Sequence, residues 1–415
     1  MIPFFRVQRF SFDQKLLVIV CLFLPGLYLL LGILAGCGYS GHGTTALLSG
    51  GTMAIVYSLT WVMGLFFFFL FPKNLSIFQS LQLIFGMALV CRIAVLLPEL
   101  IPGMSLPLCP PTPTAASPMF TLFLVRLWTH PLFEPYFVRG AVFFFDMGIL
   151  LLLLQLLHHR LLDLRWAVLY GANPLILNTF TVQGCMDAFF LFLLFVVIRY
   201  HDGKKFGRMC VCLCLALQIN YATLIVLPFL VHRKAWKYLP MIVISGGLLF
   251  LQSTWLPLSR DVWAIPPDVT IIGTLPGMIR IICGNPKIAA FLSGLLCMAL
   301  FTAGFIHYLT RQYQFTDPVK GTFMVLGFIC LFSPDPHMFS LAWVLPLAVV
   351  RASGAWISLS LFITTTVSAI YAPGSIPLSL LLIPWLPFYL LLWLDAWFFV
   401  KRSRCMKPPP PHRHA

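Results

Sequence analysis

The sequence predicts an all-α fold, a polytopic transmembrane helix bundle with about 12 to 14 spans of about 20 apolar residues each. Of its 415 residues 60% are hydrophobic and 9% are charged, and the mean hydropathy is +0.94. This composition excludes the soluble globular classes. We expect residues 1–405 to form a single integral membrane domain. Residues 406–415, rich in proline and histidine, are expected to be a disordered cytoplasmic tail.

The predicted helices follow the apolar runs of the chain in order. From the N-terminus we expect helices at 15–36, 51–72, 78–98, 137–159, 166–180, 182–199, 209–219, 221–231, 238–257, 287–310, 320–333, 338–350, 354–371 and 376–399. The first is interpreted as a membrane helix rather than a signal peptide, because further spans follow and no cleavage site is evident after Ala35. The four helices between 166 and 231 are shorter than about 20 residues, so one pair of them is re-entrant in the alternative interpretation.

Two outer loops are expected, at 99–136 and 258–286. The first is dense in proline, with residues at Pro102, Pro107, Pro110, Pro111, Pro113 and Pro118. Proline fixes φ and prevents long helices. One amphiphilic run, Met119 to Leu132, interrupts the prolines. We therefore expect a loop that carries one short re-entrant or interfacial helix.

The basic residues predict the topology. The net charge is +15, but no soluble basic domain is present to bind nucleic acid, so none is expected as a partner. Cytoplasmic loops of membrane proteins are enriched in Lys and Arg. With both termini in the cytoplasm, 21 of the 27 Lys and Arg residues lie inside and six outside. The location expected for such a chain is the bacterial inner membrane or an equivalent membrane.

Cofactor and metal sites are not predicted. Most of the 12 cysteines lie inside apolar runs, without the spacing of a metal site. The chain has no phosphate-binding loop and no nucleotide fingerprint. Neither a metal nor a cofactor is therefore expected.

Two carboxylates are predicted to lie inside helices, Asp146 and Asp187. An ionisable group within a span is costly and is treated as functional until a partner explains it. The alternative is a structural polar contact between helices, for Asp187 with Asn178 or Asn220. Carboxylates beside the inner basic clusters, such as Asp163, are expected to form local ion pairs.

Further candidates lie near the outer ends of helices. Arg92 and Glu99 are seven residues apart, which is two helical turns, so they share a face. We expect Arg92 to extend outward, so that the pair forms either an anion clamp beside a general base or an ordinary interfacial ion pair. Asp335 and His337 stand at a helix start, where Asp335 either caps the helix or belongs to the site. Such polar groups suit a substrate with a charged head and a lipid tail.

Over residues 85–350 the order of features resembles the GT-C glycosyltransferases, particularly bacterial mannosyltransferase-like members. The resemblance is carried by Arg92, Glu99, Ser117-Pro118-Met119-Phe120, Asp146, Tyr170-Gly171-Ala172-Asn173-Pro174, Gly184-Cys185-Met186-Asp187-Ala188, and Pro334-Asp335-Pro336-His337 with Trp343-Val344-Leu345-Pro346. The chain departs from the family at two places. It has Glu99 alone where family members carry paired acidic residues, and Gln218-Ile219-Asn220 where many carry a lysine.

The resemblance implies transfer of a hexose, mannose being one candidate, from a polyprenyl-phosphate-linked donor to an acceptor on the outer face. Glu99 would be the general base, while Arg92 and Arg126 would hold the phosphate and Asp187 and Asp335 would orient the acceptor. Further substrate contacts are implied for Asn173, Asn220 and His337. The first alternative is a non-catalytic GT-C-like subunit that binds membrane lipid or a partner membrane protein. The second is a transporter, which requires Asp146 and Asp187 to line one water path.

Overall fold

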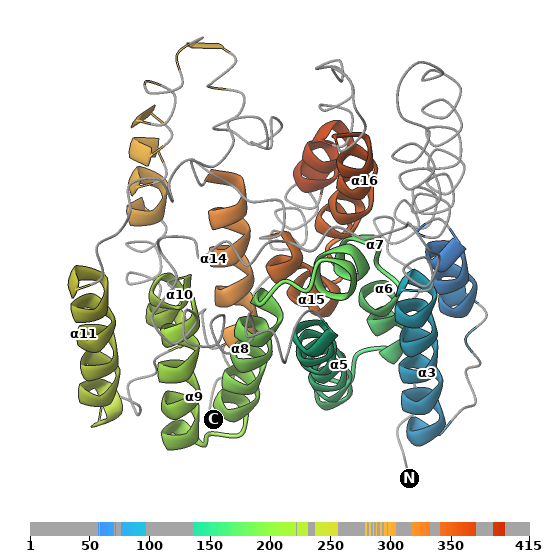
Figure 1. Ribbon diagram of the computed structural model, residues 1–415, viewed down its shortest axis with the longest axis horizontal. Helices are drawn as coiled ribbons and strands as arrows, with labels where there is room; N and C mark the ends of the chain where they lie inside the picture. The colour runs from blue at the N-terminus through green and yellow to red at the C-terminus, as the bar shows by residue number, and fades with distance from the viewer. Residues whose placement is uncertain are drawn as a thin grey trace, which may run out of the picture.

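The protein is all-helical in the part of the chain that the structure describes. This computed structural model describes residues 57, 59–69, 71, 76–96, 136–220, 222–230, 237–255, parts of 279–303, 317–332, 341–370 and 385–394. These residues form a helical bundle and contain no strand. The predicted all-α class is confirmed to that extent (Figure 1).

Most of the predicted helices coincide with observed ones. The longer helices are α3 (Ile77–Leu96), α5 (Tyr136–His159), α8 (Asp187–Asp202), α9 (Phe206–Ile219), α10 (Ala222–Leu230), α11 (Leu239–Trp255), α14 (Pro318–Phe332), α15 (Leu341–Arg351) and α16 (Gly354–Ile370). Their bounds lie close to the predicted ranges, except that α8 begins at Asp187, five residues after the predicted start at 182, so Asp187 lies at the helix start and not inside the helix as predicted. The two outer loops and the tail 406–415 lie outside the described residues, apart from the start of α5 and short helical pieces near 279–285.

Two of the described helices are long and apolar enough to cross a membrane. They are Ile77–Leu96 and Arg139–His159. A third candidate within the described chain is the pair Pro174–Val182 and Asp187–Asp202, whose axes are bent by 115°. This bend is that of a broken span or a re-entrant loop. The larger span count stays a prediction.

The predicted helix at 166–180 is wrong as a single element. It is divided into a 3₁₀ turn (Leu164–Ala167), α6 (Val168–Gly171), α7 (Pro174–Ile176) and a π-helical segment (Leu177–Val182). Pro174 disfavours the α conformation for the residue before it. Asn173 is extended, with φ −68° and ψ 124°. The chain therefore breaks at Asn173, and Gly184, with a φ of 64°, permits the turn that leads into α8.

The helices pack through apolar side chains with close approaches at small residues. α8 packs against α5 and α9, α9 also contacts α10 and α11, and α14 joins α10 to α15. A Cβ atom on Gly171 of α6 would lie 3.1 Å from the Cβ atom of Ala88 in α3. Such contacts are typical of helices that associate through small residues rather than large side chains.

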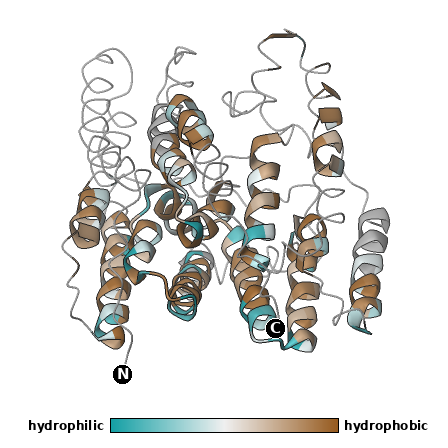
Figure 2. Cartoon of the chain, turned by 180° about the vertical axis from the view of Figure 1, so that it is seen from behind, coloured by the Kyte–Doolittle hydropathy of each residue, from teal (hydrophilic) through white to brown (hydrophobic). Residues whose placement is uncertain are grey.

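The polar residues gather at the ends of the helices (Figure 2). Arg160, just after α5, lies 2.8 Å from Asp317 and 3.3 Å from Asp202, measured from Nη2 to the carboxylate oxygens. The end of α5, the end of α8 and the start of α14 therefore meet. We call this the basic end of the bundle, because Arg160, Lys204, Lys205, Arg208 and Lys237 lie there.

Candidate functional site

Arg92 lies completely buried inside the bundle. Its Nε donates to Asp146 Oδ2 at 2.6 Å. Its Nη1 donates to the carbonyl oxygens of Ala88, at 3.0 Å, and Gly171, at 2.9 Å. The Nη2 atom has no hydrogen-bond acceptor among the described residues. The guanidinium therefore joins α3 to α5 and α6.

The second partner of Asp146 is Tyr170. The Tyr170 hydroxyl donates to Asp146 Oδ1 at 2.7 Å, and both residues are fully buried. Each carboxylate oxygen of Asp146 thus accepts a hydrogen bond. A buried ion pair is tolerated when further hydrogen bonds satisfy it, and removal of one partner leaves an uncompensated charge. This network explains why a carboxylate stands in the middle of α5.

The expected outward extension of Arg92 is wrong. Side chains on an α-helix lean toward its N-terminus, so Arg92 reaches back over the preceding turn. There it finds the carbonyl of Ala88 and the carboxylate of Asp146. An outward direction would have carried it toward the helix C-terminus and away from both.

Asn173 has a structural position. Its Oδ1 accepts from the backbone N–H of Leu175 at 2.9 Å and caps α7, while its Nδ2 donates to Ser360 Oγ in α16 at 2.9 Å. The side chain is fully buried. The substrate contact predicted for Asn173 stays a prediction, and the observed contacts fix the break in the chain against α16.

Asp187 begins α8 and is partly exposed. Asn220 Nδ2 lies 3.5 Å from Asp187 Oδ1, a long hydrogen bond. The Oδ1 of Asn220 accepts from the backbone N–H of Ala222 at 2.9 Å and so caps α10. The starts of α8 and α10 and the end of α9 are thereby joined at the end of the bundle opposite Asp202. Of the two partners predicted for Asp187, Asn220 is confirmed.

The other predicted partner, Asn178, is engaged elsewhere. Its Oδ1 accepts from the Tyr57 hydroxyl at 3.0 Å. Tyr57, Tyr170 and Ser360 are the polar residues that the sequence interpretation missed. A signal existed for Tyr170, since it opens the Tyr-x-x-Asn-Pro motif and a buried carboxylate needs a donor.

Four predicted site residues lie outside the described residues. They are Glu99, Arg126, Asp335 and His337. Of the residues to which the resemblance assigns a role, Arg92 and Asp187 are therefore described, whereas Glu99 and Asp335 are not. Arg92 faces the interior, whereas Asp187 lies partly exposed at a helix start.

No metal centre forms within the described part of the chain. Those residues contain no group of three or more His, Cys, Asp or Glu side chains that could hold an ion. Cys91, Cys210 and Cys212 are free thiols.

The basic end carries a distinct ionic cluster. Burial by itself lowers the pKa of Arg160, but the hydrogen bond and charge of Asp317, together with Asp202, outweigh it and raise that pKa above the ordinary value. Arg165 similarly pairs with Asp163. The local ion pair expected for Asp163 is confirmed. Asp202 and Asp317 instead pair with Arg160, which belongs to another segment of the chain.

Comparison with models of known protein families, with curated proteins and with solved structures gives no match to this chain.

Proposed function

We propose that the chain is a multi-pass membrane glycosyltransferase of the GT-C type, which transfers a hexose from a polyprenyl-phosphate-linked donor to an acceptor on the outer face. Two features support this proposal. The described helices include two with the length and hydropathy of membrane spans. The break between Pro174–Val182 and Asp187–Asp202 lies between the Asn173-Pro174 and Asp187-Ala188 motifs on which the resemblance rests.

The observation that carries the proposal is the position of Asp187. It is a partly exposed carboxylate at a helix start, next to the amide of Asn220. A 16-residue helix such as α8 is about 24 Å long, which separates Asp187 from the basic end. If the basic end faces the cytoplasm, as the charge distribution predicts, Asp187 faces the opposite side. A carboxylate there can accept hydrogen bonds from sugar hydroxyls.

The roles of the residues in the proposed site depend on which side-chain atoms are already hydrogen-bonded inside the bundle. Because Nε and Nη1 of Arg92 are used inside the bundle, we assign the donor phosphate to Arg126. Arg92 then acts as a positioning residue that fixes α3, the helix preceding Glu99. Glu99 takes the proton of the acceptor hydroxyl, and Asp187 orients the acceptor together with Asp335, while His337 contacts the substrate.

A second candidate is the non-catalytic membrane subunit. One observation favours it, which is that several polar motif residues serve helix packing. Gln218, at the position where many family members carry lysine, donates from Nε2 to the carbonyl oxygen of Ser245 at 2.8 Å and to its Oγ at 3.0 Å. These bonds join α9 to α11. In this reading Arg92, Asp146 and Asn173 preserve the architecture without catalysis.

The two candidates are separated by product analysis. Membranes containing the full chain are incubated with a labelled polyprenyl-phosphate hexose and the radiolabelled products are separated. The transferase proposal predicts a product that depends on the chain and falls in Asp187→Asn. Asp163→Asn is the matched control, because it removes one carboxylate charge at an exposed position and retains a good N-cap residue. Absence of any chain-dependent product with such donors would contradict the proposal.

A further inference from the structure

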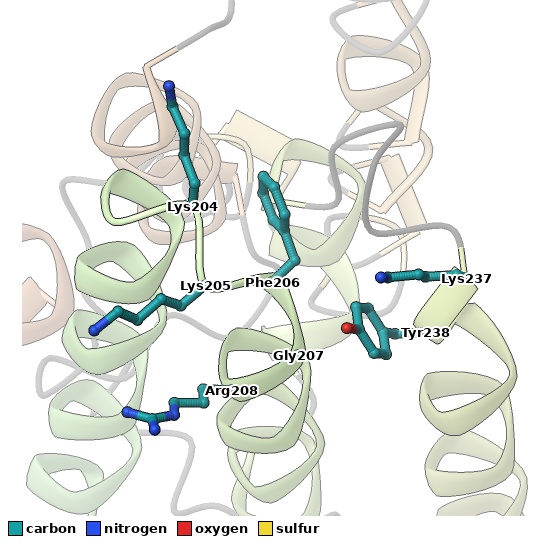
Figure 3. Close-up of a pocket in the computed structure, with 7 residues that line it drawn as sticks. All are labelled: Lys204, Lys205, Phe206, Gly207, Arg208, Lys237 and Tyr238. Carbon is teal, nitrogen blue, oxygen red and sulfur yellow. The ribbon is translucent and has the colours of Figure 1, made fainter.

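An open hollow lies at the basic end, where the α8–α9 turn meets the start of α11. Its volume is about 440 Å³, and four of its lining residues are cations, Lys204, Lys205, Arg208 and Lys237. Phe206, Gly207 and Tyr238 also line the hollow. Figure 3 shows Lys237 and Tyr238 facing the first turn of α9, with Lys205 and Arg208 extending on its other side.

These cations have no carboxylate partner among the described residues. No carboxylate lines the hollow. Asp202 and Asp317 are held by Arg160, and Asp163 is held by Arg165. The sequence from 231 to 236 adds Arg233 and Lys234 and no acidic residue. Like charges gathered without counter-charges repel one another, and a bound anion relieves that repulsion.

Two helix N-termini add to the positive potential. Cys214 Sγ contacts the carbonyl oxygen of Met241, and Gln218 contacts Ser245 one turn later in both helices. α9 and α11 therefore run parallel and begin at the same end, beside the hollow. A helix N-terminus carries a partial positive charge and backbone N–H groups without intrahelical acceptors. The N-cap residue of α9, Lys205, makes no capping hydrogen bond with its side chain.

Apolar side chains are exposed further along the two helices that begin at the hollow. α9 exposes Val211 and Leu215 along its length, and α11 exposes Val243 and Ile244. An anionic head at the start of these helices would thus have apolar side chains beside its hydrocarbon tails. Inorganic phosphate has no hydrocarbon tails to place on this apolar surface. A phospholipid makes ionic contacts with its head and apolar contacts with its tails.

We propose that the hollow formed by Lys204, Lys205, Arg208, Lys237 and Tyr238 binds the phosphate head of an anionic phospholipid at the cytoplasmic interface. The Lys and Arg side chains turn toward the phosphate, and the Tyr238 hydroxyl donates to it. The inference rests on the membrane part of the proposed function and not on sugar transfer. It assigns a lipid site to the end of the bundle opposite Asp187.

The test measures binding to the full chain purified in a neutral detergent. The probes are short-chain phosphatidylglycerol, the matching phosphatidylcholine and inorganic phosphate. We expect phosphatidylglycerol to bind at least about tenfold more tightly than the other two, and Arg208→Gln with Lys237→Gln to weaken it by roughly 10- to 30-fold. The matched control, Arg165→Gln with Arg351→Gln, removes the same charge elsewhere and should change the affinity by less than about twofold.

Three results would overturn the proposal. Equal weakening of phosphatidylglycerol binding in both double variants would show that only the net charge of the protein matters. Phosphatidylcholine binding as tightly as phosphatidylglycerol would show that the anionic head is not recognised. Inorganic phosphate binding as tightly would show that the site does not require a lipid. Wild-type protein supplies a further measurement if a variant does not fold. Raising the salt from about 0.1 M to about 1 M shortens the Debye length from about 10 to about 3 Å and should weaken phosphatidylglycerol binding. Because no sugar donor is used, failure here leaves the transfer proposal standing.

Discussion

The Arg92 guanidinium and the Asp146 carboxylate form a fully buried ion pair, with 2.6 Å between Nε and Oδ2. The pair joins α3 to α5, and Tyr170 and Gly171 extend it to α6. The transporter alternative requires Asp146 to line a water path. In the described structure both oxygens of this carboxylate are already bonded to protein groups, so that alternative gains no support.

The ion pair predicts a specific pattern of stability. Asp146→Leu leaves the Arg92 charge buried without its partner and should destabilise the protein by about 3 to 5 kcal/mol. The double variant Arg92→Met with Asp146→Leu should recover most of that loss, because neither charge remains. Thermal unfolding of the detergent-purified protein measures both. A double variant less stable than Asp146→Leu would contradict this explanation, because it would show that Arg92 stabilises the bundle even without its carboxylate partner.

Close helix packing is tested with two glycines. A Cβ atom on Gly64 would lie 2.4 Å from the Cβ atom of Ala172, whereas one on Gly86 would meet nothing within 4 Å. Gly64→Val should therefore force the helices apart and cost about 1 to 3 kcal/mol. Gly86→Val is the matched control and should cost about 1 kcal/mol or less. Equal melting temperatures for the two variants would argue against the close approach of residues 59–69 to Ala172.

The helices were predictable from sequence where one apolar run fills one element. The range 137–159 matches α5 because apolar residues fill it apart from a few polar positions such as Asp146. The division of 166–180 was not predicted, because an apolar window averages over the break at Asn173, where one side chain caps a helix start. The Asn173-Pro174 pair was the local signal for it.

The site was less predictable than the fold because its contacts are long-range. Asp146 was predicted to lie inside a helix, but Arg92 was predicted to extend outward. The two residues are 54 positions apart, and no spacing rule connects them. The seven-residue interval from Arg92 to Glu99 favoured a local pair instead. Asn220 was one of the two partners predicted for Asp187, and the contact forms because the start of α8 and the end of α9 meet.

Topology is tested by labelling single cysteines in a cysteine-free background. The charge distribution predicts that Lys204→Cys is modified by a membrane-impermeant reagent from the cytoplasmic side. Met186→Cys, next to the start of α8 and about 24 Å from its other end, should be modified from the outside. Modification of both positions from the same side would contradict the opposite exposure of Asp187 and the basic end.

Transfer activity in Glu99→Gln and Asp187→Asn tests the central proposal most directly. Gln keeps the shape of Glu99 but cannot accept a proton, and general-base assistance contributes about 10²- to 10⁴-fold. With protein abundance unchanged, the proposal predicts that Glu99→Gln loses most hexose transfer from the polyprenyl-phosphate donor, that Asp187→Asn is also impaired, and that Asp163→Asn keeps wild-type activity. Loss in Asp187→Asn alone would move the general base to α8. Full function in both Glu99→Gln and Asp187→Asn would contradict the mechanism and favour the non-catalytic subunit.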